Sequence, residues 1–216
     1  MVGAPEEGKA GRLLPAGVRG QVRDFVGREA AAVTEKTIGR RRMFSGRLLT
    51  LDVEDVQLDD GQVTTREIVG HPGAAAVLAQ DEHGRFVFVR QYRKPVDAEL
   101  VEIVAGVLRQ GEAPGRCARR ELAEETGMRA VSLVRLGIIH PSPGYTREVL
   151  HIFFAKALPG ATGARPDHDE RIAVVFMDRR QVERAIGRGA IRDAKTLAAW
   201  SLYLLAPGLG GGRARS

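Results

Sequence analysis

Apolar and polar positions divide the middle of the chain into short segments typical of strands and helices. Two runs rich in β-branched and apolar residues, 44–56 and 64–69, lie on either side of the sequence LDDGQ. The Asp60-Gly61 pair in that sequence favours a tight turn, so we predict an antiparallel β-hairpin. Further short apolar runs predict strands at 74–79, 86–90, 131–139, 149–155 and 172–177.

Helices are predicted in three places. Pro114 favours the first turn of a helix and Gly127 favours its end, so one helix is expected between them. Two more are expected at 182–186 and 193–205, and the apolar spacing of the second, which includes Trp200, predicts packing against a sheet. Strands and helices arranged in this way predict an α/β fold with a compact mixed sheet.

Carboxylates crowd the first of these helices. Glu121 and Glu125 stand one turn apart on one face, and Glu124 lies beside them. Such neighbours repel one another unless a cation lies between them, and hard divalent cations favour clusters of carboxylate oxygens. The alternative is a solvated acidic helix whose carboxylates pair with nearby arginines, namely Arg116, Arg119 and Arg120.

These glutamates belong to a longer spaced motif. Its specified positions are Gly106, Glu112, Arg120, Glu121, Leu122, Glu124, Glu125, Gly127 and Met128. The pattern resembles the Nudix box at every specified position. This resemblance implies a Nudix-type α/β/α sandwich with a mixed sheet, in which the box forms a loop-helix-loop at one end of the sheet. It also implies hydrolysis of a nucleoside diphosphate linked to another group, with water attacking a phosphorus of the pyrophosphate.

The resemblance to the Nudix box further implies a metal site. Glu121 and Glu125 are the expected direct ligands, with Glu124 contributing directly or through water. The backbone carbonyl of Ala105 is a further expected ligand. Because all these ligands are oxygens, Mg²⁺ is the expected cofactor, although Mn²⁺ also suits them. Arg120 is expected to hold a carboxylate in its metal-binding orientation, so we count Arg120 and Glu124 as catalytic residues.

Segments beside the box resemble the Nudix subgroup that hydrolyses ADP-ribose and related nucleoside diphosphate sugars. They are RQYR at 90–93, PSPG at 141–144 and EIVAG at 102–106, in which valine replaces the usual proline of the subgroup. The predicted substrate-binding residues are Arg66, Arg90, Arg93, Glu102, Ser142 and Gly144. The arginines suit bidentate contacts with phosphate oxygens but equally suit an exposed strand end, and PSPG also suits a plain rigid turn.

A polar segment at 158–169, which contains Gly and Pro, precedes the last predicted strand. In the subgroup, a loop at this position carries a glutamate that completes the active site as a metal ligand or general base. Glu170 is the candidate for this catalytic role, and Asp169 is its competitor.

The net charge of +6 belongs to the two ends of the chain. Residues 1–42 carry +4 and residues 206–216 carry +2, while the remaining 163 residues balance to zero. We therefore interpret 1–42 as a basic, partly flexible extension, 43–205 as the catalytic domain and 206–216 as a flexible tail. The central domain lacks the electrostatic footprint of a polyanion-binding protein, so nucleic acid is not an expected partner. Arg40 to Arg42 suit either a phosphate contact or a solvated segment.

Other features of the sequence predict a cytoplasmic protein. No apolar run approaches the length of a transmembrane helix, and the first residues lack the pattern of a signal peptide. The single cysteine, Cys117, cannot form an intramolecular disulfide, and its place within a predicted helix favours a packing role. No membrane partner is expected.

We therefore expect a Mg²⁺-dependent ADP-ribose pyrophosphatase that yields AMP and ribose 5-phosphate. One rival hypothesis keeps this chemistry and changes the substrate to another nucleotide sugar, such as GDP-mannose. Another is a non-catalytic module that senses ADP-ribose, with the basic ends contacting nucleic acid. The subgroup resemblance also implies a homodimer in which the N-terminal strands, 43–70, reach the site of the partner.

Overall fold

The computed structural model describes residues 34–160 and 172–209. Their strands are β1 (Lys36–Ser45), β2 (Thr50–Gln57), β3 (Val63–Gly70), β4 (Ala74–Gln80), β5 (Phe86–Arg93), β6 (Ala98–Glu102), β7 (Val104–Val107), β8 (Met128–Ile139), β9 (Leu150–Pro159) and β10 (Ile172–Met177). The helices are η1 (Lys94–Val96), α1 (Pro114–Thr126), α2 (Arg179–Gly187) and α3 (Ala194–Leu205). The predicted helices are present, and most of the predicted strands are present and extend beyond their predicted ends. The single strand predicted at 44–56 was wrong: residues 44–45 end β1 and β2 begins at Thr50, because the chain turns between them, where the N–H of Gly46 bonds to the carbonyl of Leu49 at 2.9 Å.

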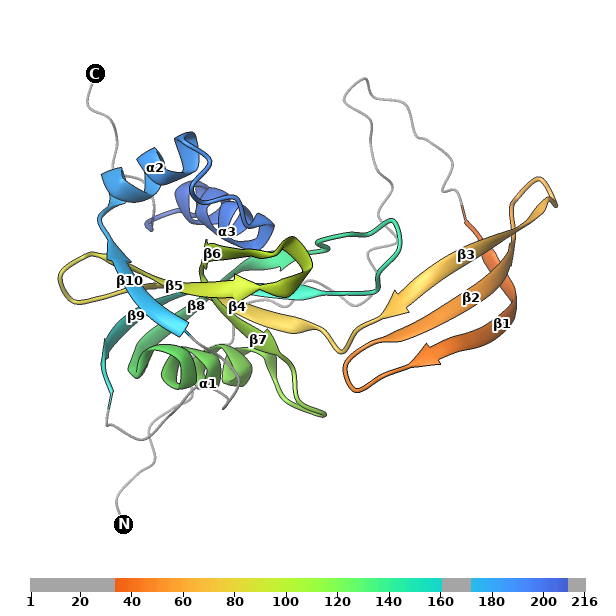
Figure 1. The fold of residues 1–216 in the computed structure, drawn as a ribbon, viewed down its shortest axis with the longest axis horizontal. Helices are drawn as coiled ribbons and strands as arrows, with labels where there is room; N and C mark the ends of the chain where they lie inside the picture. Colours follow the sequence, from red (N-terminus) through yellow and green to blue (C-terminus); the bar gives the residue numbers. More distant parts are fainter. Residues whose placement is uncertain (1–33, 161–171, 210–216) are drawn as a thin grey trace, which may run out of the picture.

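Two sheets organise these elements (Figure 1). A seven-stranded sheet has the order β10-β5-β4-β9-β8, with β6 paired to β5 and β7 paired to β4. Strands β4 and β9 run parallel and the other pairs run antiparallel, so the sheet is mixed as predicted. Helix α1 covers one face and helices α2 and α3 cover the other, which confirms the α/β/α sandwich (Figure 1).

Strand β4 supplies both cores of the sandwich because successive side chains of a strand point to opposite faces. Its side chains at 74, 76 and 78 pack toward α2 and α3, whereas those at 75, 77 and 79 pack toward α1. On the α3 side, the ring centroids of Phe86 and Trp200 lie 4.9 Å apart in an edge-on arrangement. Trp200 is buried, which confirms its predicted role in the core.

The second sheet contains the predicted hairpin, formed by β2 and β3, and one strand that was not predicted. Strand β1 pairs with β2 and crosses the boundary that sequence analysis placed between residues 42 and 43. Its guanidinium groups pair across the strands: Arg40 with Glu54, Arg41 with Asp55 and Arg42 with Asp52. The basic run is therefore part of a salt-bridged strand surface. Strand β1 was not predicted because its charged residues do not show the apolar alternation by which a strand is recognised.

Three predicted features lie outside the described residues. These are the flexible part of the N-terminal extension, the segment that contains Asp169 and Glu170, and most of the C-terminal tail. Within the described ranges, none of the helices has the length and apolar character needed to cross a membrane.

Candidate active site

Helix α1 places the acidic side chains, and its ends follow from the sequence. Pro114 stands in the first turn, where its missing N–H leaves no helical hydrogen bond unmade. Gly127 ends the helix with φ 69°, a left-handed conformation that glycine adopts without steric cost, and its N–H bonds to the carbonyl of Ala123. The buried face, Cys117, Ala118 and Leu122, packs against the sheet. The glutamates consequently face away from the core.

Cys117 lies at the junction between this helix and strand β7. Its Sγ lies 3.5 Å from the carbonyl oxygen of Gly106 and 3.6 Å from that of Val107. Burial raises the pKa of the Cys117 thiol to about 12, so the thiol stays protonated and donates to these carbonyls. The prediction that Cys117 packs rather than reacts agrees with this environment.

A cavity of about 390 Å³ lies between the acidic face of α1 and strand β7. We call it the carboxylate cavity; its lining residues are Leu48, Arg93, Ala105, Gly106, Val107, Arg109, Arg120, Glu121, Glu124 and Glu125. The four residues predicted to hold a metal, Ala105, Glu121, Glu124 and Glu125, thus meet in one place. Leu48, from the turn between β1 and β2, was not predicted, because nothing in the local sequence links that turn to the box.

Arg120 organises the carboxylates around it. Its Nη1 lies 2.5 Å from Glu121 Oε1 and 2.8 Å from Glu124 Oε2, and its Nε lies 2.9 Å from Glu112 Oε1. These bonds hold the pKa of Arg120 above its ordinary value. The Arg120 guanidinium, together with the backbone N–H of Arg109, lowers the pKa of Glu112 to about 2. Glu112 is thus a fully ionised anchor for Arg120 at neutral pH.

Gly106 lets the chain approach Glu121 closely. A Cβ built at this position would overlap the carboxylate and the Cγ of Glu121. The absent side chain therefore leaves room for Glu121 beside the backbone of β7, where the neighbouring residue is Ala105. This is the physical reason for the first glycine of the motif.

The donors of the carboxylate cavity suit a hard divalent cation. Among residues 34–160 and 172–209, no three His, Cys, Asp or Glu side chains converge on one point. A single cationic nitrogen, Arg120 Nη1, instead lies between the carboxylates of Glu121 and Glu124. Because the carboxylates of Glu121, Glu124 and Glu125 line one cavity and supply only oxygen donors, the residues fit Mg²⁺ or Mn²⁺ by donor type and charge.

Two predicted substrate-binding residues, Arg93 and Glu102, bind each other at the edge of this cavity. Glu102 is 1% exposed, and its oxygens accept from Arg93 Nε at 3.0 Å and Nη2 at 2.7 Å. Lys195 Nζ, at the start of α3, lies 2.5 Å from the same carboxylate. Burial alone would raise the pKa of Glu102, but the two cations hold it below its ordinary value. Lys195 was not predicted, because it lies 93 positions from its partner along the chain.

The remaining predicted substrate-binding residues lie outside the carboxylate cavity of the single chain. Arg66 pairs with Glu35 in the three-stranded sheet, and the exposed Arg90 lies 3.8 Å from Glu99. Ser142 and Gly144 belong to the loop between β8 and β9.

This loop is tied to the three-stranded sheet. The backbone N–H of Val69 bonds to the carbonyl of Tyr145 at 2.7 Å, and the N–H of Arg147 bonds to the carbonyl of Val69 at 2.9 Å. Arg147 also reaches the buried carboxylate of Glu54 at 2.6 Å. The position of the PSPG loop therefore follows that of the sheet.

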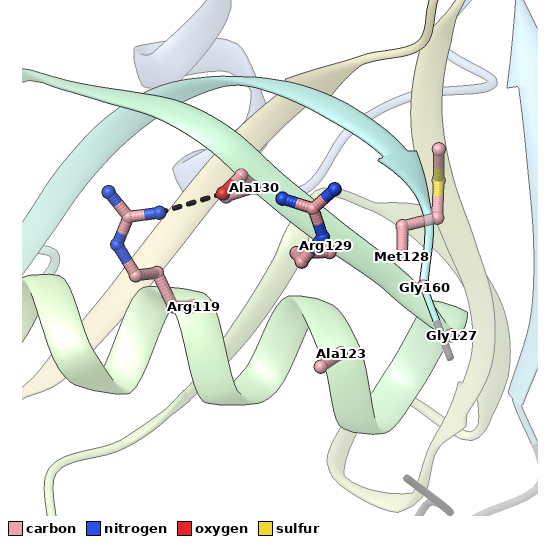
Figure 2. A pocket seen from close by; sticks show the side chains of 7 residues that line it. All are labelled: Arg119, Ala123, Gly127, Met128, Arg129, Ala130 and Gly160. Atoms are coloured by element: carbon pink, nitrogen blue, oxygen red, sulfur yellow. Dashed lines mark hydrogen bonds between the residues drawn. The ribbon is translucent and has the colours of Figure 1, made fainter. Parts of the chain in front are cut away.

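A second cavity, of about 420 Å³, lies between α1 and the start of β8 (Figure 2). Its lining residues are Arg119, Ala123, Gly127, Met128, Arg129, Ala130 and Gly160. Figure 2 shows Arg119 reaching across to strand β8, where its Nη1 donates to the carbonyl of Ala130 at 2.9 Å. None of the predicted site residues is among these lining residues, and none of the lining residues carries a carboxylate, so the carboxylate cavity is the candidate site.

Comparisons with known proteins agree with this fold and site. The NUDIX domain model matches residues 70–200. ADP-ribose pyrophosphatase from Bacillus subtilis (strain 168) is 41% identical over 166 residues, which cover 76% of this chain and 90% of that protein. A methanol dehydrogenase activator from Bacillus methanolicus is 42% identical over 166 residues, with the same coverage of each chain. The crystal structure of an ADP compounds hydrolase has a TM-score of 0.71 at 19% identity, covering 83% of this chain and 99% of that one.

The sandwich, the acidic helix and the matched domain together define one class of protein. The chain belongs to the Nudix family, as predicted from the motif at 106–128. Nudix hydrolases generally use divalent metal ions, which agrees with the oxygen donors of the carboxylate cavity. The domain match begins at residue 70, the last residue of β3, so the rest of the three-stranded sheet lies outside it.

Proposed function

We propose that this Nudix pyrophosphohydrolase acts on ADP-ribose and releases AMP and ribose 5-phosphate, with Mg²⁺ as its cofactor. The carboxylate cavity carries the proposal, because it combines the glutamates of the box with Arg93 and Arg109, two cations suited to phosphate oxygens. The 41% identity to an ADP-ribose pyrophosphatase over 76% of the chain supports the choice of substrate. GDP-mannose remains the rival substrate, since pocket shape decides between nucleotide sugars.

Each residue has a separate role in the proposed reaction. Glu121 and Glu125 would hold the metal with the Ala105 carbonyl, and Glu124 would assist them. A bound Mg²⁺ supplies charge neutralisation at the pyrophosphate and lowers the pKa of a coordinated water. Arg120 keeps Glu121 and Glu124 in place through its two bonds from Nη1.

The remaining steps concern the phosphates and the attacking water. Arg93 and Arg109 orient the phosphate oxygens from the walls of the carboxylate cavity. Glu170, with Asp169 as its competitor, stays our prediction for the loop carboxylate that accepts a proton from the attacking water or binds the metal.

The test of this proposal combines a substrate panel with one substitution. Wild-type protein and Glu125→Gln are assayed on ADP-ribose, GDP-mannose and other nucleoside diphosphate compounds, with and without Mg²⁺ and a chelator. We expect ADP-ribose to be the best substrate, and Glu125→Gln to lower kcat at least about 100-fold with an unchanged circular dichroism spectrum. Glu82→Gln, at an exposed side chain, is the control. Activity of Glu125→Gln within a few-fold of wild type would refute the assigned metal ligand.

We also infer a homodimer in the cytoplasm. The three-stranded sheet and its turns expose six large apolar side chains in the single chain: Ile38, Met43, Phe44, Leu48, Leu49 and Val63. The subgroup resemblance implies that such a sheet reaches the site of the partner chain, and we infer that Arg66 of the sheet contributes to substrate binding there.

A further inference from the structure

A buried carboxylate beside the carboxylate cavity is shared by two cations from different parts of the chain. Glu102 ends strand β6 and is 1% exposed, while Arg93 ends β5 and Lys195 stands in the first turn of α3. An ionised carboxylate is costly to bury unless it is paired and hydrogen-bonded. Glu102 meets this requirement only with both partners, since Arg93 and Lys195 are the cations bonded to it in the described part of the chain.

The hydrogen bonds of Glu102 fix the plane of the Arg93 guanidinium. Nε and Nη2 of Arg93 bind the two carboxylate oxygens, a two-pronged arrangement that sets orientation as well as distance. The hydrogen bonds of the Arg93 guanidinium within residues 34–160 and 172–209 come from Nε and Nη2, and Arg93 lines the carboxylate cavity together with Glu125, whose charge also attracts it. Glu102 thus leaves Nη1 of Arg93 for a ligand.

Helix α3 holds Lys195 in place through its N-terminal cap. The Asp193 side chain accepts from Thr196 N at 3.0 Å and from Lys195 Nζ at 2.9 Å. Thr196 Oγ1 in turn accepts from the backbone N–H of Ile103 at 2.9 Å, in a fully buried bond next to Glu102. Thr196, through Ile103, and Lys195, through Glu102, therefore fasten the start of α3 to the end of β6, and both side chains also bind Asp193. Lys195 is 18% exposed.

We propose that Lys195 is a positioning residue for substrate binding, which acts by holding Glu102 so that Arg93 presents Nη1 to a phosphate oxygen. This inference rests on the proposed function of the carboxylate cavity. With Lys195 present, the negative charge of Glu102 is shared by two cations. The positive charge of Arg93 is then only partly neutralised and can attract a phosphate oxygen. Without it, Glu102 pairs with Arg93 alone, and the buried carboxylate draws the guanidinium away from the ligand.

The first test separates binding from chemistry. Lys195→Met keeps the length of the side chain and removes its charge, so we expect KM for ADP-ribose to rise about tenfold while kcat changes less than about twofold. Lys195→Arg restores a cation and is expected to return KM to within about threefold of wild type. An unchanged KM in Lys195→Met, or an equal fall in kcat and kcat/KM, would overturn the proposal.

The second test asks whether Lys195 acts through Arg93. Arg93→Gln raises KM by itself, and adding Lys195→Met to it should raise KM no further, because the residue being positioned is gone. An additive rise in KM would show that Lys195 contacts the substrate independently, which contradicts a positioning role. Glu102→Gln combined with Lys195→Met removes the buried charge as well and keeps the question answerable if Lys195→Met folds poorly. Because Lys195 acts through the Glu102 carboxylate, this double variant should have the same KM as Glu102→Gln alone, and a higher KM in the double variant would overturn the proposal.

A matched control addresses general loosening of α3. Thr196→Val removes the bond to Ile103 N and the 2.7 Å bond from Thr196 Oγ1 to Asp193, while leaving the charges of Lys195, Glu102 and Asp193 intact. We expect a lower melting temperature and an unchanged KM; a KM increase equal to that of Lys195→Met would assign the effect to loosening and overturn the proposal.

Wild-type activity on the substrate panel is measured first. If another compound is hydrolysed in place of ADP-ribose, the proposed substrate fails and the Lys195 variants are compared on that compound. If none is hydrolysed, ADP-ribose binding is compared by calorimetry.

Discussion

At the scale of single residues, the arrangement of the carboxylate cavity depends on Gly106, which has no side chain. Glu121 lies so close to the β7 backbone that any side chain at position 106 would collide with it. The collision would move a proposed metal ligand without touching the charge of the site. The glycine is therefore a geometric requirement of the carboxylate arrangement.

This requirement gives a prediction for Gly106→Ala. We expect the added methyl group to displace Glu121, so that kcat/KM falls at least about 100-fold and the apparent Mg²⁺ affinity weakens. Gly115→Ala is the matched control: its Cβ would lie 3.6 Å from Leu133, an ordinary contact, and alanine favours a helix. Steady-state kinetics with a Mg²⁺ titration measure both variants. Near-normal activity of Gly106→Ala would contradict the close approach.

At the scale of elements, Glu112 joins the loop after β7 to helix α1. Its carboxylate accepts from the backbone N–H of Arg109 at 3.0 Å and from Arg120 Nε at 2.9 Å. These contacts stabilise the ionised form, which lowers the pKa of Glu112 to about 2 from its ordinary value of 4.5. Protonation of Glu112 in acid should consequently weaken the connection between this loop and the helix.

The linkage between protonation and folding sets the direction in which stability changes with pH. Because the folded-state pKa is lowered, the stabilisation by Glu112 is complete above about pH 4.5 and is lost as the pH falls toward 2. Glu112→Gln should therefore be less stable than wild type at neutral pH, and the difference should shrink between pH 4.5 and 2. Urea unfolding at several pH values measures this. Glu82→Gln, at an exposed carboxylate, should keep the wild-type pH dependence, and a constant difference for Glu112→Gln would contradict the assignment.

At the scale of the whole molecule, the three-stranded sheet stands apart from the sandwich and exposes apolar side chains (Figure 1). Phe44 is 58% exposed and Met43 is 61% exposed in the single chain. The turn of the same sheet supplies Leu48 to the carboxylate cavity, and the loop at 142–147 is bonded to its last strand. A partner that covered this sheet would therefore influence the geometry of the site.

Light scattering tests the dimer. Wild-type protein is expected at twice the chain mass of 23.4 kDa, and Phe44→Asp is expected to shift toward the monomer because it places a charge in the covered apolar surface. Leu205→Gln, at an 80% exposed side chain at the end of α3, is the control and should remain dimeric. A monomeric wild type that retains full activity on dilution would rule out a shared site.

The family and the acidic helix could be predicted from the sequence because their determinants are local. The box spans residues 106–128, and helical periodicity alone places Glu121 and Glu125 on one face. Apolar alternation likewise predicted most strands and the mixed sheet. Strand β1 escaped prediction because its arginines pair with carboxylates of β2, and that pairing exists only across the sheet.

Tertiary structure decided how the candidate site residues meet. Arg93 and Glu102 were predicted as separate ligands of substrate, but the burial of Glu102 makes them partners, and Lys195, far along the chain, completes the charge balance. The close approach of Gly106 to Glu121 also depends on how β7 packs beside α1. Local sequence therefore determined the reaction chemistry that this protein can support, whereas long-range packing decided which charges remain available to a ligand.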